Sequence, residues 1–328
     1  MRPTRTTLAA SLLVLVLLPA CAGTDPGGPG GSTPTGATTV TDGPTGGAAE
    51  PATFPITITD DDGVSVTIAE EPQRIITFAP SMTEIVFALG LGDRVVGVSG
   101  PFDDFPAEAE AIQEVGGAGD FGVDPNVEQV VALEPDLFLT IAGGDQWKER
   151  LRDLDVPVVT LDATDLEDLL TDIEAAGLVT GATDAAATLI ADLQAQALEV
   201  EQAVGAVEPV TCFYETFYPP LYTVGPGTFI YDLLERGGCD PVTSSAAMQY
   251  PEWSIEDLVD QDPAVYLVSS ESGASPRAVA RRPGFEAITA VAEGLVVPID
   301  ADLAERPGPR IVLGLRAIAE ALHPDAFD

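Results

Sequence analysis

The residue types that carry out enzyme chemistry are scarce in this 328-residue sequence. Its only histidine, His323, lies beside Pro324 near the end of the chain, where we expect a structural role. No HExxH motif, CxxC pair or P-loop signature is present, so the usual sources of a nucleophile, a metal site or a phosphate cradle are missing. The glycine-rich segment 116–122 does not join a strand to a helix, and we interpret it as a loop. We therefore predict a binding module rather than an enzyme, with no metal site and no cofactor of its own.

Aromatic residues are concentrated in a region that suits ligand binding. Nine of the chain's 20 aromatic residues lie between positions 213 and 253. Some of these are expected in the core, but Phe217 and Tyr218 precede two prolines in a predicted loop after a strand, which is where open α/β sheets bind ligands. Together with Tyr250 and, from the first half of the chain, Trp147, they are predicted to line a cleft for a large flat or apolar ligand.

Acidic residues strongly outnumber basic ones. The 53 Asp and Glu residues against 14 Lys and Arg residues give a net charge of −39. Nucleic acid is therefore not expected as a partner, because binding it requires clustered basic side chains. We interpret the acidic surface as an adaptation for solubility or high salt. Against this background Arg306 and Arg310 are candidate cleft residues, which either contact an anionic ligand or pair with acids nearby, and the sequence leaves both open.

The first 20 residues have the pattern of a targeting segment. Two arginines precede an apolar run over 8–18, which is too short to cross a bilayer that needs about 20 helical residues. Cys21 and the three residues before it resemble a lipobox, so we predict a signal peptide over 1–20 and a lipid on Cys21. An ordinary secretory signal with an incidental cysteine is the alternative. The Gly-, Pro- and Thr-rich segment 21–53 is predicted to be a disordered tether. Together, the signal peptide and the lipid predict that the protein lies outside the cytoplasm, anchored to the cell membrane.

From residue 54 onward the pattern is that of an α/β protein. Segment 56–68 alternates apolar and polar residues around a central Asp-Gly, which predicts a β-hairpin. Beyond it, short apolar strands alternate with helices, an order typical of parallel sheets covered by helices. The order predicts one α/β lobe over 54–164, a linking helical segment over 165–207 and a second α/β lobe over 208–328.

Local signals add two expectations. Ser81 and Glu84 are spaced as a capping box at the start of the first helix, with Ser81 reaching forward and Glu84 reaching back. Cys212 and Cys239 are the cysteines that remain beside Cys21, and an exported chain permits their oxidation. We predict a disulfide between them, with two buried thiols as the alternative.

A short internal repeat indicates that the two lobes are alike. NVEQVVALEPDLFL at 126–139 matches SIEDLVDQDPAVYL at 254–267, and each copy reads as a helix followed by a strand. Glu128 and Glu256 occupy the same position in the two copies, seven residues before a proline. Taken alone, so short a match is also compatible with independent α/β packing.

Several of these segments, in order, resemble the ABC-transporter solute-binding proteins for iron complexes and vitamin B12. The resemblance covers about residues 54 to 328 and rests on the following motifs: RIITFAPSMTEIVFALGLGDRVVGVS at 74–99, the repeat copy at 126–139, PPLYTVGPGTFIYDLLERGG at 219–238, WSIEDLVDQDP at 253–263 and RPGPRIVLGLRAIAEALHP at 306–324. It implies two Rossmann-like lobes with parallel sheets joined by a single long backbone helix, the class III solute-binding fold, with little hinge motion.

The resemblance also implies a function. A lipid-anchored, monomeric receptor would capture a ferric-siderophore-type iron complex or cobalamin in the cleft and deliver it to a membrane permease. In the family, glutamates at the positions of Glu128 and Glu256 pair with permease arginines. Haem is less favoured, because no second histidine is present. A surface-anchored enzyme or an adhesion module on a similar fold is the alternative function.

Overall fold

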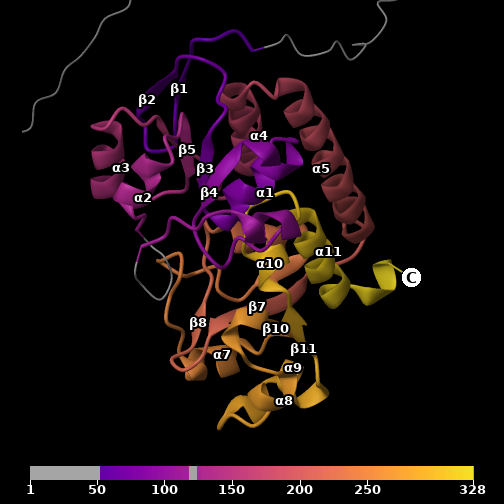
Figure 1. The fold of residues 1–328 in the computed structure, drawn as a ribbon. Coiled ribbons are helices and arrows are strands. Elements are labelled where there is room, and N and C mark those ends of the chain that lie inside the picture. Colours follow the sequence, from indigo (N-terminus) through magenta and orange to yellow (C-terminus); the bar gives the residue numbers. More distant parts are fainter. Residues whose placement is uncertain (1–51, 118–123, 328) are drawn as a thin grey trace, which may run out of the picture. The chain divides into compact units, whose positions relative to one another are not determined.

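Two largely parallel β-sheets, one in each half of the chain, organise the fold (Figure 1). The computed structural model describes residues 52–117 and 124–327. The predicted signal peptide, Cys21, nearly all of the predicted tether and most of the glycine-rich segment 116–122 lie outside the described residues.

The N-terminal lobe is built on a four-stranded, all-parallel sheet with the order β4-β3-β5-β6. Its central strands are buried along their whole length, as expected for apolar runs in a parallel sheet covered on both faces. The elements are β3 (Ile75–Phe78), β4 (Val95–Val98), β5 (Leu137–Thr140), β6 (Val158–Thr160), α1 (Pro80–Ala88), α2 (Val127–Ala132) and α3 (Asp145–Arg152). This confirms the predicted alternation of strands and helices.

A separate hairpin precedes this sheet, as predicted. Strand β1 (Ile56–Thr59) pairs antiparallel with β2 (Ser65–Ile68). An ion pair fixes its turn to the lobe, because Lys148 Nζ lies 2.8 Å from Asp62 Oδ2 and also donates to Thr160 Oγ1 at 3.0 Å. The side chain of Lys148 is fully buried, so the hairpin supplies the carboxylate that its charge requires.

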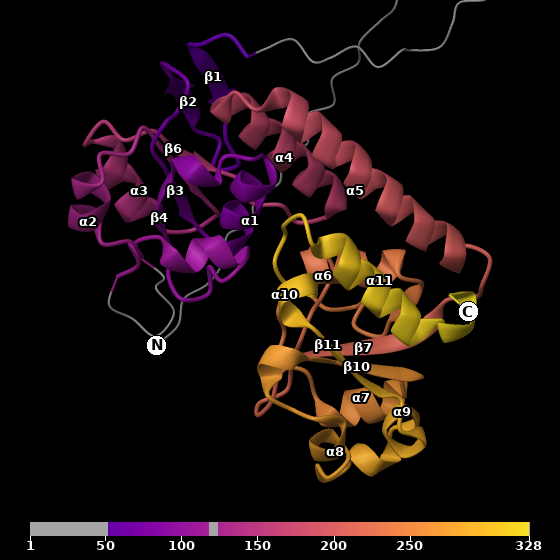
Figure 2. The same ribbon diagram turned by 45° about the vertical axis from the view of Figure 1, so that its right-hand side comes forward.

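Two helices link the lobes. Helix α4 (Leu166–Thr180) ends at Gly181, whose φ of +79° favours glycine, and α5 (Thr183–Val204) follows directly. Helix α5 packs against α4 and, further along, against α11 of the second lobe. Figure 2 shows α5 running from the first lobe to the second.

The C-terminal lobe repeats the design around a five-stranded sheet with the order β11-β10-β7-β8, in which β9 pairs with β7. Only β8 runs antiparallel to its neighbour. Figure 2 shows α6 and α11 on one face of this sheet and α7, α8 and α9 on the other. The elements are β7 (Val210–Phe217), β8 (Tyr222–Thr223), β9 (Cys239–Pro241), β10 (Val265–Ser269), β11 (Val296–Ile299), α6 (Phe229–Arg236), α7 (Ile255–Gln261), α8 (Pro276–Val279), α9 (Thr289–Glu293), α10 (Ala301–Ala304) and α11 (Ile311–Leu322).

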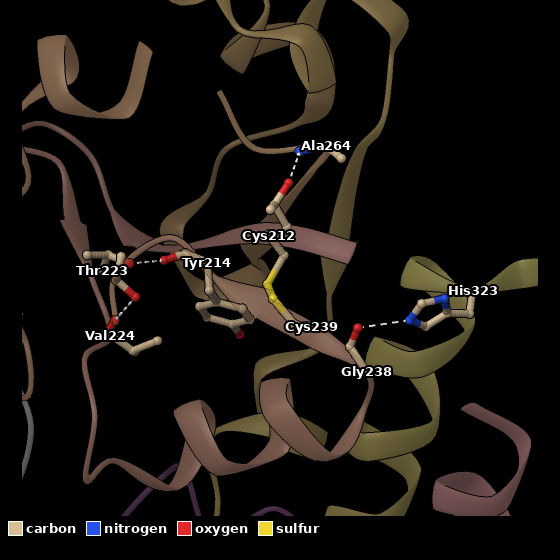
Figure 3. Close-up of a disulfide and its surroundings, with 10 residues drawn as sticks. Cys212, Tyr214, Thr223, Val224, Gly238, Cys239, Ala264 and His323 are labelled. Atoms are coloured by element: carbon tan, nitrogen blue, oxygen red, sulfur yellow. Dashed lines mark hydrogen bonds between the residues drawn. A yellow bond between two sulfur atoms is a disulfide. The ribbon is translucent and has the colours of Figure 1, made fainter. Parts of the chain in front are cut away.

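The predicted disulfide is present between β7 and β9 (Figure 3). Cys212 and Cys239 lie on these two paired strands, with their Cα atoms 5.8 Å apart. Both residues are buried. His323 lies nearby and donates from Nε2 to the carbonyl of Gly238 at 2.9 Å, which gives it the structural role expected from the sequence.

The predicted capping box is wrong. Helix α1 begins at Pro80 with Ala79 as its N-cap, and no side chain caps it. Proline suits the first helical position, because its missing N–H has no partner to lose there. Ser81 is therefore already inside the first turn, and the carboxylate of Glu84 binds Arg310 instead of the backbone.

Candidate ligand-binding cleft

The strands of both lobes direct their carboxyl ends toward a hollow between the lobes. This hollow has a volume of about 300 Å³. Its N-terminal wall follows strands β3 and β4, and its C-terminal wall follows β10 and β11, which is where open α/β sheets place their ligands. The lining includes Pro80, Ser99, Phe102, Glu271, Glu305 and Arg306. We call it the interlobe hollow.

A second hollow of about 270 Å³ adjoins it on the N-terminal lobe. Both hollows are lined by Pro80 and Ser99, so they adjoin at these two residues, and we refer to them together as the cleft. The second hollow lies over the ends of β3 and β5 and is lined by Phe78, Thr140 and Trp147. The resulting cleft combines polar groups at the strand ends with an aromatic wall.

Trp147 forms that aromatic wall. Its ring lies 5.5 Å from the ring of Phe78 and 5.6 Å from that of Phe138, measured between centroids. Gly144, with φ of +77°, makes room for the indole, because a Cβ there would lie 2.0 Å from Nε1 of Trp147. The Nε1–H is buried and has no acceptor in the described part of the chain.

On the opposite lobe, Phe217 is the last residue of β7 and pairs with Tyr222 of β8, so it lies in a strand and not in the loop expected from the sequence, whereas Tyr218 begins the turn that follows. Phe217 is 48% exposed, with its ring 6.5 Å from that of Tyr222. Tyr218 is partly buried and stacks on the guanidinium of Arg282, 4.0 Å from the ring centroid. Arg282 in turn pairs with the fully buried Glu215. This buried ion pair fixes the loop, and nothing in the sequence distinguished Glu215 from the other acids.

Tyr250 is exposed and lies within electrostatic range of both lobes. Burial of its hydroxyl raises the pKa of Tyr250, and the negative charges of Glu305 and Asp162 raise it further. Asp162 follows the last strand of the N-terminal lobe, whereas Glu305 lies in the C-terminal lobe. Tyr250, Phe217 and Tyr218, which the sequence predicted to line the cleft, are not among the described residues that line the two hollows.

Arg306 and Arg310 pair with acids. Arg306 lies 3.1 Å from Asp104 Oδ1 and 2.6 Å from Asp302 Oδ1. Arg310 binds both carboxylate oxygens of Glu84, at 2.9 and 2.6 Å. Asp104 and Glu84 belong to the N-terminal lobe, so both arginines join the lobes. Arg306 also lines the interlobe hollow, whereas Arg310 lines neither part of the cleft.

Carboxylates lie on both sides of the cleft. Glu305 accepts a hydrogen bond from the hydroxyl of Tyr214 at 2.8 Å. Burial raises the pKa of Glu305, and the charges of Glu271 and Asp302 contribute in the same direction. Sequence reasoning missed these acids, because they do not differ in pattern from the many other carboxylates of the chain.

A larger hollow of about 580 Å³ lies elsewhere, beside α1. It is lined by Phe87, Ile112 and Pro309, and it touches Val95 at the amino end of β4. Because it lies away from the carboxyl ends of the strands, we do not assign the ligand to it.

Glu128 and Glu256 occupy equivalent places in the two lobes. Each is exposed in the first turn of a short helix, α2 or α7. The carboxylate of Glu256 accepts from the hydroxyl of Ser254 at 3.0 Å. Hydrogen bonds from its own backbone N–H and from Ser254 lower the pKa of Glu256, so it is ionised at neutral pH. No described residue forms an ion pair with either glutamate.

Comparison with known proteins agrees with this architecture. Residues 75–303 match the family described as periplasmic binding protein. An uncharacterized ABC transporter substrate-binding lipoprotein of Bacillus subtilis, YvrC, is 34% identical over 84% of this chain and 87% of its own length. A cobalamin-binding protein of Halobacterium salinarum is 29% identical over 82% of this chain and 74% of its own length.

A solved structure is similar as well. The crystal structure of an ABC-type Fe³⁺-hydroxamate transport system from Saccharomonospora viridis is 28% identical, with a TM-score of 0.68 over 82% of this chain and 99% of that chain. These similarities confirm the predicted α/β fold of solute-binding proteins and the prediction that the chain is not an enzyme. The chain belongs to the periplasmic binding protein family, whose members are the substrate-binding components of ABC transporters.

Proposed function

We propose that this protein is a lipid-anchored receptor that captures a corrinoid or a ferric chelate in the interlobe cleft and delivers it to an ABC permease. The observation that carries the proposal is the cleft itself, in which a hollow of about 300 Å³ lies at the carboxyl ends of strands from both sheets and an adjoining hollow of about 270 Å³ lies over the N-terminal sheet. Small-molecule pockets in proteins are typically about 300 to 1,000 Å³, so adjoining hollows of this size suit a ligand held between two lobes.

The exposed apolar side chains around the cleft support a ligand of this class. Phe102 lines the interlobe hollow and is 44% exposed, and Ile141 lines the second hollow and is also exposed. Exposed apolar groups of this kind are suited to a corrinoid ring or to the hydrocarbon backbone of an iron chelator. The names of the similar proteins, cobalamin-binding and Fe³⁺-hydroxamate transport, lie in the same two ligand classes.

The exposed glutamates support docking to a permease. Glu128 and Glu256 present one free carboxylate from each lobe, in equivalent positions of the repeat. A carboxylate in the first turn of a helix also favours the helix dipole by about 0.3 to 1 kcal/mol, but this local role does not require the same position in both lobes. Two matched carboxylates are suited to two arginines related by the symmetry of a permease dimer.

The anchor would keep the receptor at the membrane. None of the helices in the described part of the chain combines the length and the apolarity needed to cross a bilayer. Lipid on Cys21 would provide attachment, and the segment 22–53 would provide reach, which raises the local concentration of the receptor at its permease. Mass spectrometry of the mature N-terminus tests this part directly, because a non-acylated N-terminus contradicts it.

Transport measurements test the docking proposal. Glu128→Arg combined with Glu256→Arg should abolish uptake of the bound ligand while its affinity, measured by calorimetry, stays unchanged. Glu286→Arg, an exposed glutamate on the C-terminal lobe, serves as the charge-reversal control and should leave uptake intact. Loss of affinity together with normal uptake would exclude the docking role.

A thermal-shift screen tests the ligand class. Cyanocobalamin, ferric trihydroxamates, ferric catecholates and haem are the probes, because a ligand that binds only the folded protein must raise its melting temperature. A shift with a corrinoid or a ferric chelate supports the proposal. The absence of a shift with every probe contradicts it.

A further inference from the structure

The charged groups of the cleft are predominantly acidic. Among the described residues that line its two hollows, Glu271, Glu305 and Asp124 carry carboxylates, and Arg306 is the one basic side chain. Glu271, Glu305 and Asp124 form no ion pair within the described part of the chain. The cleft therefore presents carboxylates that a bound ligand has to face.

The one basic side chain does not offset this charge. The guanidinium of Arg306 already binds Asp104 and Asp302, and its side chain is only 13% exposed. Two carboxylates around one guanidinium leave that group of three with a net negative charge. Breaking these contacts to bind an anionic ligand would leave Asp104 and Asp302 without their partner, so Arg306 is not available as an anion site.

The C-terminal wall of the cleft shows the effect of crowded negative charge. Glu305 is held by neutral donors, including the hydroxyl of Tyr214 at 2.8 Å, and no cation contacts it in the described structure. The negative charges of Glu271 and Asp302 raise the pKa of Glu305, and the negative charge of Glu305 in turn raises the pKa of Tyr250. A cation entering the cleft would relieve this repulsion, whereas an anion would add to it. On the N-terminal side, the rings of Phe78 and Trp147 line the same hollow as Asp124, and such a low-dielectric wall strengthens the field of its carboxylate.

From this arrangement we infer that the cleft selects uncharged or cationic ligands and rejects anionic ones. The inference rests on the proposed function and narrows it. Uncharged corrinoids and uncharged or cationic ferric hydroxamates fit the cleft, whereas polyanionic ferric catecholates and haem, with its two propionates, do not. Of the two roles that the sequence left open for Arg306, pairing with acids is the one that the geometry supports.

A charge series on fixed scaffolds tests the inference. One scaffold is a linear ferric trihydroxamate whose terminal amine is free, acetylated or succinylated, so that the chelate is cationic, uncharged or anionic with little change in shape. The other is cyanocobalamin, compared with its monocarboxylate derivative and with the aminoethyl amide of that carboxylate. Calorimetry on the purified mature protein measures the dissociation constant of each.

On the scaffold that binds, we expect affinity to fall roughly tenfold for each unit of negative charge added to the ligand. The difference in affinity between the cationic and anionic forms should become smaller as the salt concentration is raised. Equal affinity across the series, or tightest binding of the anionic form, overturns the inference while leaving the proposed function intact. Failure of both scaffolds in every charge state, with binding of an unrelated compound instead, overturns the proposed function and the inference together.

Variants locate the effect. In Glu271→Gln combined with Glu305→Gln, the amide oxygen at position 305 can still accept a hydrogen bond from Tyr214. The ratio of affinities for the cationic and anionic probes should shrink at least fivefold. Glu293→Gln removes one exposed carboxylate on α9, away from the residues that line the cleft, and should leave this ratio unchanged. Melting temperatures of both variants report folding separately. A folded double variant with an unchanged ratio would show that these carboxylates do not set the selectivity.

Discussion

A buried aspartate on the linking helix α4 allows us to predict how the stability of the protein depends on pH. Asp172 is only 4% exposed, and its Oδ2 receives no hydrogen bond in the described structure. Its carboxyl contacts that of Asp61, in the turn of the β1–β2 hairpin, and Asp162 and Asp168 add further negative charge nearby. Burial, followed by the charge of Asp61, raises the pKa of Asp172 to about 8. At neutral pH the folded protein therefore keeps this carboxyl protonated.

The sign of the effect on stability follows from this pKa. In the unfolded chain Asp172 ionises near its ordinary pKa of 3.8. Below pH 3.8 the carboxyl of Asp172 is protonated in both the folded and the unfolded state, so it does not lower the free energy of unfolding. Above this pH only the unfolded state releases the proton, so stability is lost as the pH rises toward 8. Each pH unit in this window costs about 1.4 kcal/mol per proton. Between pH 5 and pH 8 the loss is on the order of 4 kcal/mol, and relaxation around the site lowers it.

Asp172→Asn removes the ionisable group while keeping its size and its ability to donate to Asp61. We expect the variant to be more stable than the original protein, by an amount that grows with pH. Urea unfolding at pH 5 and pH 8, followed by far-ultraviolet circular dichroism, measures this difference. Asp192→Asn, an exposed change on α5, is the control and should not alter the slope. Parallel stability curves for Asp172→Asn and the original protein would refute the reasoning.

Two other perturbations test how the lobes are built. Arg310→Met should destabilise the protein by about 3 kcal/mol in urea unfolding, because it leaves the buried carboxylate of Glu84 without its partner. Combining it with Glu84→Leu removes that carboxylate and should recover most of the lost stability. Equal losses for the single and double variants would contradict this explanation. Replacing Cys212 and Cys239 by alanine removes a disulfide between residues 27 positions apart and should lower the free energy of unfolding by about 3 to 4 kcal/mol. If the original protein has the same free energy of unfolding with and without reductant, the disulfide contributes nothing to stability.

Sequence reasoning predicted the elements with strong local signals. The buried runs of β3 and β5 and the hairpin around Asp62-Gly63 depend on neighbouring residues, and the structure contains each of them. Strands β8 and β9 were missed, because two or three residues in a strand produce no periodic pattern.

The partners of individual side chains could not be predicted in the same way. Arg306 and Asp104 are 202 positions apart, and Arg310 and Glu84 are 226 apart. Such pairs are formed by the approach of the two lobes and leave no trace in local spacing. The misassigned capping box has the same origin, because Glu84 fitted a local motif while its actual partner lies in the other lobe. The aromatic residues were located only in part, because β7 extends to Phe217, which the sequence placed in a loop, and Tyr218 packs against Arg282 and Phe285.

The 22-residue helix α5 has a consequence for the kinetics of capture. A helix of this length extends about 33 Å and resists bending, and the ion pairs of Arg306 and Arg310 tie the same two lobes at the edge of the cleft. We therefore expect the lobes to have little freedom to swing shut over a ligand. Capture should then proceed as a single encounter whose observed rate rises in proportion to ligand concentration, and the contacts inside the cleft should set how long the ligand stays.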